Sequence, residues 1–373
     1  MDALTTPSNW QRVRLGDIGK PCMCKRVMKH QTTRYGEIPF YKIGTFGNTA
    51  DAFISKKLFL EYKTKYSFPK KGDILISASG TIGRAVIYDG KPAYFQDSNI
   101  VWIDNDETLV KNDFLFYAYS NIKWNTEHTT ILRLYNDNFR NTLIPLPPLH
   151  EQIAIANILS DLDHYLYSLD ALILKKESVK KALSFELLSQ RKRLKGFNQA
   201  WQRVRLGDIT NYLTSNLSAE QITQQGKIKV YDVNNFIGYT DITFISDKPY
   251  ISIVKDGSVG RVRILPPKTN ILSTMGALIA NHKTTTEFLF YLLSNFDFKN
   301  FTSGSIIPHI YFKDYKEKTI FLPPLNEQIA IANVLSALDS EIISLKNKKR
   351  QFDNIKKALN HDLMSAKIRV LKK

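Results

Sequence analysis

The sequence predicts an α+β protein with a pseudo-twofold internal repeat: two globular α/β domains separated by two long antiparallel coiled-coil helices. Three observations support this prediction. The segment 147–163 recurs at 323–339 with fourteen of seventeen residues identical. The nine residues 10–18 recur unchanged at 201–209. After each Pro-Pro pair the hydrophobic period changes from about two residues to about three and a half, so a helix is expected to follow each domain.

The two duplicated motifs recur at different distances along the chain. The motifs are therefore constant, whereas the inserts between them differ in length. The motif that begins at Trp10 returns after 191 residues, whereas the Pro-Pro motif returns after 176, so the first insert is 15 residues longer. The expected boundaries are 1–147 and 196–323 for the two domains, and 148–195 and 324–373 for the two helices.

Both inserts are expected to contain strands followed by one helix, because short β-branched and aromatic runs alternate with Gly punctuation. The strands of the first insert are predicted at 38–43, 73–77, 85–88 and 99–103, with a helix at 113–122. Those of the second are predicted at 227–233, 250–254 and 262–265, with a helix at 287–295. The turn 79–84 has its counterpart at 256–261, so the inserts should share a fold.

The segments after the Pro-Pro pairs are predicted to be helices of about 40 residues, on the order of 60 Å long. Their apolar residues recur in steps of four and three, which is typical of a coiled-coil seam. In each helix the first half is acidic and the second half is basic, so antiparallel pairing would place opposite charges together. The alternative is a solvated charged face without a role in pairing.

Composition favours a polyanionic partner. The 373 residues carry a formal charge of +17 with a pI near 9.5 and 43% hydrophobic content. This balance points to nucleic acid before a membrane surface, although a merely basic surface is the alternative.

The cysteines and the N-terminus suggest a cytoplasmic protein. Cys22 and Cys24, even with His30, cannot complete a four-ligand zinc site and are expected to be free thiols. Residues 1–7 do not resemble a signal peptide, and no apolar run approaches eighteen residues, so no membrane span is expected.

Catalytic motifs are not found in the sequence. It lacks a phosphate-binding loop, a Gly-x-Ser-x-Gly elbow and a His-Glu-x-x-His motif, and the glycines of 79–83 are interpreted as a structural turn. The alternative catalytic hypothesis is a metal-dependent endonuclease that uses Asp51, Glu61 and Lys63. That pattern has no counterpart in the second insert.

Basic, amide and hydroxyl side chains stand at equivalent turns and strand ends of the two inserts, and such groups bind base edges and phosphates. The predicted DNA-binding residues of the first insert are Lys42, Thr45, Thr81, Arg84, Arg133 and Tyr135. Those of the second are Lys229, Asn234, Ser258, Arg261, Arg263, His309 and Tyr311.

The duplicated Pro-Leu-Pro-Pro-Leu-x-Glu-Gln-Ile helix entrance and the duplicated Trp-x-x-x-x-Leu-Gly-Asp-Ile lead resemble the specificity subunit of type I restriction-modification systems, over essentially the whole chain. The resemblance implies two target-recognition domains, each of which reads one half of a split, asymmetric DNA site. It also implies spacer helices, two modification subunits that methylate adenine, and restriction subunits that can join them. The subunit itself is then non-catalytic and needs no cofactor, because S-adenosylmethionine and nucleotides belong to the partners.

Partner contacts are expected at the duplicated helix entrance. The residues concerned are Glu151, Gln152, Asn157, Glu327, Gln328 and Asn333.

The sequence departs from the pattern of this family near the end of the insert, where 132–135 reads Leu-Arg-Leu-Tyr but 308–311 reads Pro-His-Ile-Tyr. The arginine contact implied by the resemblance therefore transfers only to the first insert.

The expected function follows from the arrangement of two reading domains on rods of fixed length. Such a protein would bind two short base sequences only at one separation. A pure assembly scaffold without sequence preference is the remaining alternative, beside the endonuclease.

Overall fold

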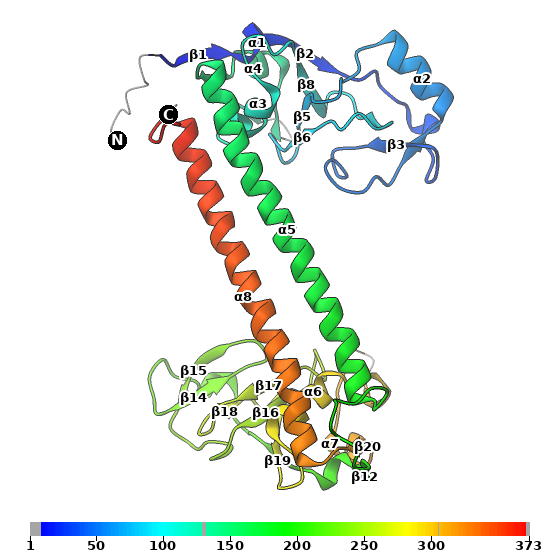
Figure 1. Ribbon diagram of the computed structural model, residues 1–373, viewed down its shortest axis with the longest axis vertical. Coiled ribbons are helices and arrows are strands. Elements are labelled where there is room, and N and C mark those ends of the chain that lie inside the picture. Colours follow the sequence, from blue (N-terminus) through cyan, green and yellow to red (C-terminus); the bar gives the residue numbers. More distant parts are fainter. Residues whose placement is uncertain (1–8, 129–131, 305, 371–373) are drawn as a thin grey trace. The chain divides into compact units, whose positions relative to one another are not determined.

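The computed structural model describes residues 9–128, 132–304 and 306–370, and they form two compact units. The first unit comprises the described residues up to Leu169 together with those from Lys348 onward, and the second comprises Asp170–Asn347. Each unit therefore contains one globular domain and parts of both long helices, which Figure 1 labels α5 and α8.

The globular part of the first unit is a mixture of short strands and helices. In chain order its elements are β1 (Gln11–Arg14), α1 (Leu15–Ile18), β2 (Gly19–Met23), the 3-10 helix η1 (Lys29–Gln31), β3 (Ile38–Tyr41), β4 (Phe53–Ile54), α2 (Lys56–Lys65), β5 (Ile74–Ser77), β6 (Ala85–Ile87), β7 (Tyr94–Phe95), β8 (Ile100–Asn105), α3 (Asn112–Tyr119), β9 (Glu127–His128), β10 (Leu132–Arg133), α4 (Asn136–Asn141) and β11 (Leu143–Leu146).

The second unit repeats this order with fewer elements. They are β12 (Gln202–Arg205), η2 (Leu206–Asp208), β13 (Thr210–Thr214), η3 (Ala219–Gln221), β14 (Ile228–Tyr231), β15 (Phe236–Thr240), β16 (Tyr250–Val254), β17 (Val262–Leu265), β18 (Asn270–Ile271), β19 (Met275–Ala280), α6 (Thr286–Ser294), η4 (Lys299–Phe301), α7 (Phe312–Tyr315) and β20 (Thr319–Leu322).

The sheets of the two units have the same topology, which confirms that the inserts share a fold. A four-stranded antiparallel sheet has the order β2-β8-β5-β6 in the first unit and β13-β19-β16-β17 in the second. A three-stranded sheet, β4-β3-β7 or β15-β14-β18, contains one parallel pair in each unit. The strand at each Trp motif pairs with the strand before the Pro-Pro motif, as β1 with β11 and β12 with β20.

The duplicated sequence motifs form the main core of each unit. In the first unit Trp10, Leu15 and Ile144 are buried against Leu159 of α5 and Leu363 near the end of α8. In the second unit the corresponding cluster contains Trp201, Leu206, Ile320, Leu335 and Leu187. The repeats are therefore alike because the same apolar side chains attach each domain to both helices.

The two long helices run antiparallel in each unit. Helix α5 (Leu149–Leu188) and helix α8 (Leu325–Met364) have 40 residues each, as expected. In the first unit Asp163 pairs with Lys356, and the rings of Tyr165 and Phe352 are 4.8 Å apart.

In the second unit the partners again run in opposite directions along the two helices. Lys176 pairs with Glu341 at 2.8 Å, and Arg193, which follows α5, pairs with Glu327 at the start of α8. The acidic first halves thus meet the basic second halves, which confirms the interpretation of the charges.

Helix α5 ends seven residues before the expected boundary at 195. Gln190 has φ +60, and the Lys192 amide donates to the Glu186 carbonyl at 3.1 Å. This pattern is a left-handed cap that satisfies the last carbonyls of the helix. The end of α8 is closed in the same way by Ala366.

Helix α8 meets a length and composition test for crossing a membrane, which was not expected from the sequence. It contains an apolar 18-residue window, 28% of which is buried. Core helices of soluble proteins meet the same test. The apolar residues Ile331 and Leu335 are buried in the core of the second unit, and Asp339 is paired with Lys180.

Candidate nucleic-acid interface

In the first unit, the turn after β5 lies beside β10 and forms a polar corner. This first corner comprises residues 78–84 and 132–135. The Leu134 amide donates to the Ala78 carbonyl at 2.9 Å. Gly83 has φ +82, and a Cβ at this residue would lie 2.1 Å from Nε1 of Trp124, so only glycine allows the turn to pack there.

The second unit builds the same corner from 255–261 and 308–311. The Ile310 amide donates to the Lys255 carbonyl at 2.9 Å, as Leu134 does to Ala78. Gly260 has φ +79 and lies against Phe298, where Gly83 lies against Trp124. One backbone frame therefore carries different side chains in the two units.

Eight of the predicted DNA-binding residues lie on these corners. The first corner carries Thr81, Arg84, Arg133 and Tyr135, and the second carries Ser258, Arg261, His309 and Tyr311. All except Arg133 and His309 are exposed, and those two are partly exposed. Each corner therefore carries basic, hydroxyl and tyrosine side chains that are exposed or partly exposed.

A neighbouring loop adds Lys42 and Thr45 to the first corner. Nη1 of Arg84 donates to the Phe46 carbonyl at 3.0 Å, which ties the loop to the turn. Lys42 forms an ion pair of 2.8 Å with Asp51, and the Thr45 hydroxyl accepts from the Lys42 amide at 3.1 Å. The loop is thus ordered by its own polar contacts.

In the second unit it is Arg263 that makes the contact corresponding to that of Arg84. Its Nη1 donates to the Asn234 carbonyl at 2.9 Å, and its guanidinium lies over the Tyr231 ring. Sequence alignment paired Arg84 with Arg261, which is exposed. Lys229 is exposed on β14.

Two polar residues were missed by sequence reasoning: Asn99, which contacts both segments of the first corner, and Asp256, which belongs to the second corner. Asn99 accepts a hydrogen bond of 2.8 Å from the Ser79 hydroxyl and lies 3.5 Å from Nη2 of Arg133. In the second corner Asp256 lies 2.6 Å from Nδ1 of His309. The alignment of Ser79 with Asp256 at the head of each turn was the available signal.

The residues of the endonuclease hypothesis are engaged elsewhere. Asp51 pairs with Lys42, Glu61 pairs with Lys65 at 3.1 Å, and Lys63 lies over the Phe59 ring. Within the part of the chain that the structure describes, no group of three or more His, Cys, Asp or Glu side chains could hold a metal ion.

Both cysteines are free thiols, and Cys24 is buried. Burial raises the pKa of the Cys24 thiol to about 12, so this side chain stays protonated at neutral pH and is a poor nucleophile.

Four of the predicted partner-binding residues are buried and hold the domain to its helix. Glu151 accepts from Trp10 Nε1 at 3.0 Å and forms a two-pronged pair with Arg369. Gln152 donates to the Pro147 carbonyl at 2.8 Å and accepts from the Lys111 amide.

The second unit repeats these contacts. Glu327 accepts from Trp201 Nε1 and pairs with Arg193, while Gln328 donates to the Pro323 carbonyl at 2.8 Å. Because all four side chains are at most 2% exposed, they have no surface for a partner, which corrects that expectation.

The other two predicted partner residues lie on an exposed face of each helix entrance. Asn157 is exposed, as are the apolar residues Leu149 and Ile153, which are spaced four apart on the same side of α5. The same face of α8 exposes Leu325, Ile329 and Asn333. We refer to these two sets as the entrance faces.

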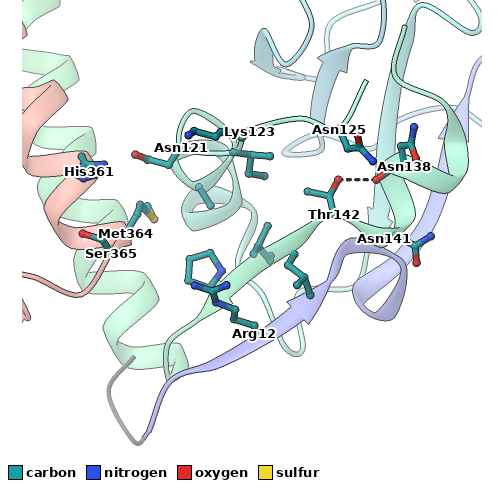
Figure 2. A pocket seen from close by; sticks show the side chains of 15 residues that line it. Arg12, Asn121, Lys123, Asn125, Asn138, Asn141, Thr142, His361, Met364 and Ser365 are labelled. Carbon is teal, nitrogen blue, oxygen red and sulfur yellow. Dashed lines mark hydrogen bonds between the residues drawn. The ribbon is translucent and has the colours of Figure 1, made fainter. Parts of the chain in front are cut away.

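A pocket of about 520 Å³ lies in the first unit between β11, the residues after α3 and the end of α8 (Figure 2). Its polar lining includes Arg12, Lys123 and His361, and none of the fifteen described residues that line it is acidic. At the positions equivalent to Lys123 and Asn141 the second unit has Asp297 and Glu317. The pocket therefore does not belong to the duplicated surfaces.

Comparisons with known proteins agree with this architecture. The chain is 64% identical over 148 residues to the putative type I restriction enzyme specificity subunit S.HindORF215P of Haemophilus influenzae, a match that spans 39% of this chain and 38% of that protein. It is 29% identical over 405 residues to the putative MjaX specificity subunit of Methanocaldococcus jannaschii, over 98% of this chain and 95% of the relative.

Solved structures show the same fold. The S subunit of a type I restriction-modification system from M. genitalium matches with a TM-score of 0.65 at 19% identity, over 98% of this chain and 99% of the other. A chain from a structure of a type I R-M system, solved for its complex assembly and conformational transition, matches with a TM-score of 0.59 at 16% identity, over 96% and 98%.

The family model described as "Type I restriction modification DNA specificity domain" matches twice. The matched residues are 7–176 and 198–352, so each match covers one globular domain and the start of the helix that follows it. On this evidence of two matches that together span most of its length, the chain belongs to the family of type I restriction-modification DNA specificity domains.

Proposed function

We propose that this chain is the non-catalytic DNA-reading subunit of a type I restriction-modification complex, and that each domain reads one half of a bipartite, asymmetric site. Residues 1–147 and 196–323 are then the target-recognition domains, and 148–195 and 324–373 are the spacer helices. The proposal includes a cytoplasmic location, and it assigns the methyl donor and nucleotides to partner subunits.

The observation that carries this proposal is the duplicated corner with different side chains. The backbone hydrogen bonds and glycine turns are the same in both units, whereas Thr81, Arg133 and Asn99 are replaced by other residues in the second. A constant frame with variable side chains suits two half-sites of different base sequence. The net charge of +17 supplies the attraction to phosphates that such binding needs.

The proposed DNA contacts are of two kinds. Groups on the corners are placed to read bases, namely Thr81, Arg133, Tyr135, Ser258, Arg261, His309 and Tyr311. The remaining groups lie on or beside the neighbouring loops and are proposed to hold phosphates or position the corner. They are Lys42, Thr45, Arg84 and Arg263, whose side chains contact those loops, and the exposed residues Lys229 and Asn234. Phosphate contacts fix the register on the duplex and base contacts supply the sequence preference.

The entrance faces are proposed as docking sites for two modification subunits. Leu149, Ile153 and Asn157 recur as Leu325, Ile329 and Asn333 with identical chemistry, and they are exposed although their apolar side chains would be more stable when covered. Identical surfaces suit two copies of the same partner. Restriction subunits would join through the assembled complex.

The test is selection of DNA from a randomised pool by this chain assembled with its modification subunits. Wild type should enrich two short half-sites at a fixed spacing. Arg133→Ala should relax base preference in one half-site only, because its corner belongs to one domain. Lys357→Ala removes an exposed charge on α8 and serves as the matched control, which should leave both preferences unchanged. Partner binding without any enriched sequence would support the scaffold alternative and reject this function.

A further inference from the structure

The two corners hold different reading groups at the same backbone position. An isolated bridge pairs Ser79 with Arg133 in the first corner and Asp256 with His309 in the second. Arg133 is approached by the Asn99 amide oxygen, whereas Nδ1 of His309 lies 2.6 Å from the Asp256 carboxylate. The second corner therefore replaces a guanidinium by an imidazole with its own anionic partner.

The backbone of His309 is fixed from both sides. Its amide donates to the Ser303 carbonyl at 2.7 Å, and its carbonyl accepts from the Ser303 amide at 2.9 Å. On the other side it bridges Asp256. The side chain nevertheless remains 36% exposed, so part of the ring is accessible.

The carboxylate determines which nitrogen faces outward. A carboxylate only accepts hydrogen bonds, so it holds the proton on Nδ1 and leaves Nε2 for a ligand. In the neutral ring Nε2 is an acceptor, which suits the amino groups of adenine or cytosine. In the charged ring Nε2 is a donor, which suits the O6 and N7 atoms of guanine.

We propose that His309, oriented by Asp256, is a specificity-determining residue of the second half-site, and that its protonation state selects between amino-bearing and acceptor base edges. This inference rests on the proposed DNA-reading function. Arg133 at the equivalent place is always a donor, so the first half-site has no such dependence.

Several charged or titratable residues lie near His309 in the chain or in the fold. Lys255 and Asp256 belong to the turn, and Tyr311 and Lys313 follow His309 in the sequence. Burial and, to a smaller extent, the negative charge of Asp256 raise the pKa of the Tyr212 phenol, so Tyr212 of β13 also lies near this pair. Among these residue types only histidine ordinarily changes charge between about pH 5 and pH 8.

The experiment is the same selection with the assembled complex, performed at about pH 5.5 and about pH 8 at constant ionic strength. Wild type should change its base ratio at one position of the second half-site by about three- to tenfold, the scale of one hydrogen bond. The first half-site should keep its preference.

Two variants separate chemistry from folding. His309→Gln retains a polar side chain that does not titrate, so the second half-site should still be enriched but without the pH dependence. The double variant Asp256→Ser with His309→Arg imitates the first corner and should prefer guanine at that position at both pH values. Thermal unfolding of each variant checks that the unit is intact.

Two results would overturn the inference. One is a wild-type second half-site with the same base ratios at both pH values. The other is a pH dependence that survives His309→Gln. If wild type enriches no half-site at all, the DNA-reading function itself fails, which is a different outcome from the loss of pH dependence.

Discussion

At the residue scale, a buried carboxylate in each unit joins segments that are far apart in the sequence. Glu151 receives hydrogen bonds from Trp10 near the start of the chain and from Arg369 near its end, and Glu327 receives the same from Trp201 and Arg193. A buried carboxylate is stable only when its partners remain, and removal of one partner leaves a costly unpaired charge. These contacts explain why Trp and Glu recur at the two motifs.

Glu151→Gln should lower the free energy of unfolding of the first unit by about 2 kcal/mol, because Arg369, whose side chain is 36% exposed, would lose its charged hydrogen-bond partner. Urea unfolding followed by tryptophan fluorescence measures this loss. Glu317→Gln, at an exposed ion pair with Arg205, is the control and should have little effect. A loss of the same size in both variants would contradict the assignment.

The stability contributed by Glu151 should depend on pH. Burial opposes ionisation, but the hydrogen bonds from Arg369 and Trp10 outweigh it and hold the pKa of the Glu151 carboxyl below its usual value. A lowered folded-state pKa gives stability that is present above the unfolded-state pKa and is lost as pH falls through the folded-state pKa. The difference between wild type and Glu151→Gln should therefore shrink in acid, as measured by unfolding from neutral pH downward.

Residue types and repeats predicted where the polar groups gather, but their partners depended on packing. Thr81 and Tyr135 lie on the first corner as expected. The role of Arg263, the contacts of Asn99 and the burial of Gln152 come from residues distant in the sequence, which periodicity does not reveal.

At the element scale, one three-residue contact joins each domain helix to both long helices. The Tyr117 hydroxyl donates to Asp163 at 2.8 Å, and Lys356 pairs with the same carboxylate while it lies over the Tyr117 ring. Tyr291, Asp339 and Lys180 repeat the arrangement. Because the carboxylate comes from one long helix and the lysine from the other, the contact fixes the register of the pair in each unit.

The length of the helices is predicted to set the spacing of the half-sites. Insertion of seven residues into both α5, between Asp163 and Lys176, and α8, between Glu341 and Phe352, adds two turns or about 10.5 Å. The preferred spacer should lengthen by about three base pairs, with both half-site sequences unchanged. Selection from the randomised pool measures the spacing, and an unchanged spacing would refute the prediction that helix length sets it.

Insertion into α5 alone is the control. It places the apolar seam of α5 out of register with that of α8, so it should destabilise the protein without producing a new preferred spacing.

The long helices and main strands were predictable because their periodicity is strong. The prediction at 73–77 matches β5 (Ile74–Ser77), and 287–295 matches α6 (Thr286–Ser294). Helix α2 was missed, although Ser55 caps it by accepting from the Leu58 amide at 3.2 Å. Its apolar pattern is weak, and among the described residues the second unit has no helix at the equivalent place, between β15 and β16, that would have revealed it.

At the scale of the whole molecule, the chain is nearly circular in its connectivity. The first unit contains both ends of the described chain, and Glu151 contacts residues near each of them. Gly196, between the first helix and the second domain, has φ +94 and open space around it. Arg193, which precedes this glycine, pairs with Glu327 in the second unit, as Arg369 pairs with Glu151 in the first.

A permutant opened after Gly196, with the original ends joined by a short linker, should fold and bind the same DNA. The break crosses the backbone hydrogen bond from the Phe197 amide to the Leu194 carbonyl, but it leaves Trp201 and Arg193 in the chain to pair with Glu327. Solubility, thermal unfolding and DNA selection measure the outcome. A permutant opened after Gly80 is the matched control and should lose the first half-site, because the break lies in the first corner. An insoluble Gly196 permutant would contradict the near-circular connectivity.

The discontinuous first unit also constrains how the protein is made. Its core includes Leu363 and Met364, and its buried Glu151 is paired by Arg369, so the first domain cannot be completed until residues 363–369 have been translated. The second unit, Asp170–Asn347, can close while synthesis continues. A nascent chain that stops after Asn347 would therefore retain a finished second unit and an unfinished first one, whose exposed apolar surface marks it for proteolysis before it can occupy a partner.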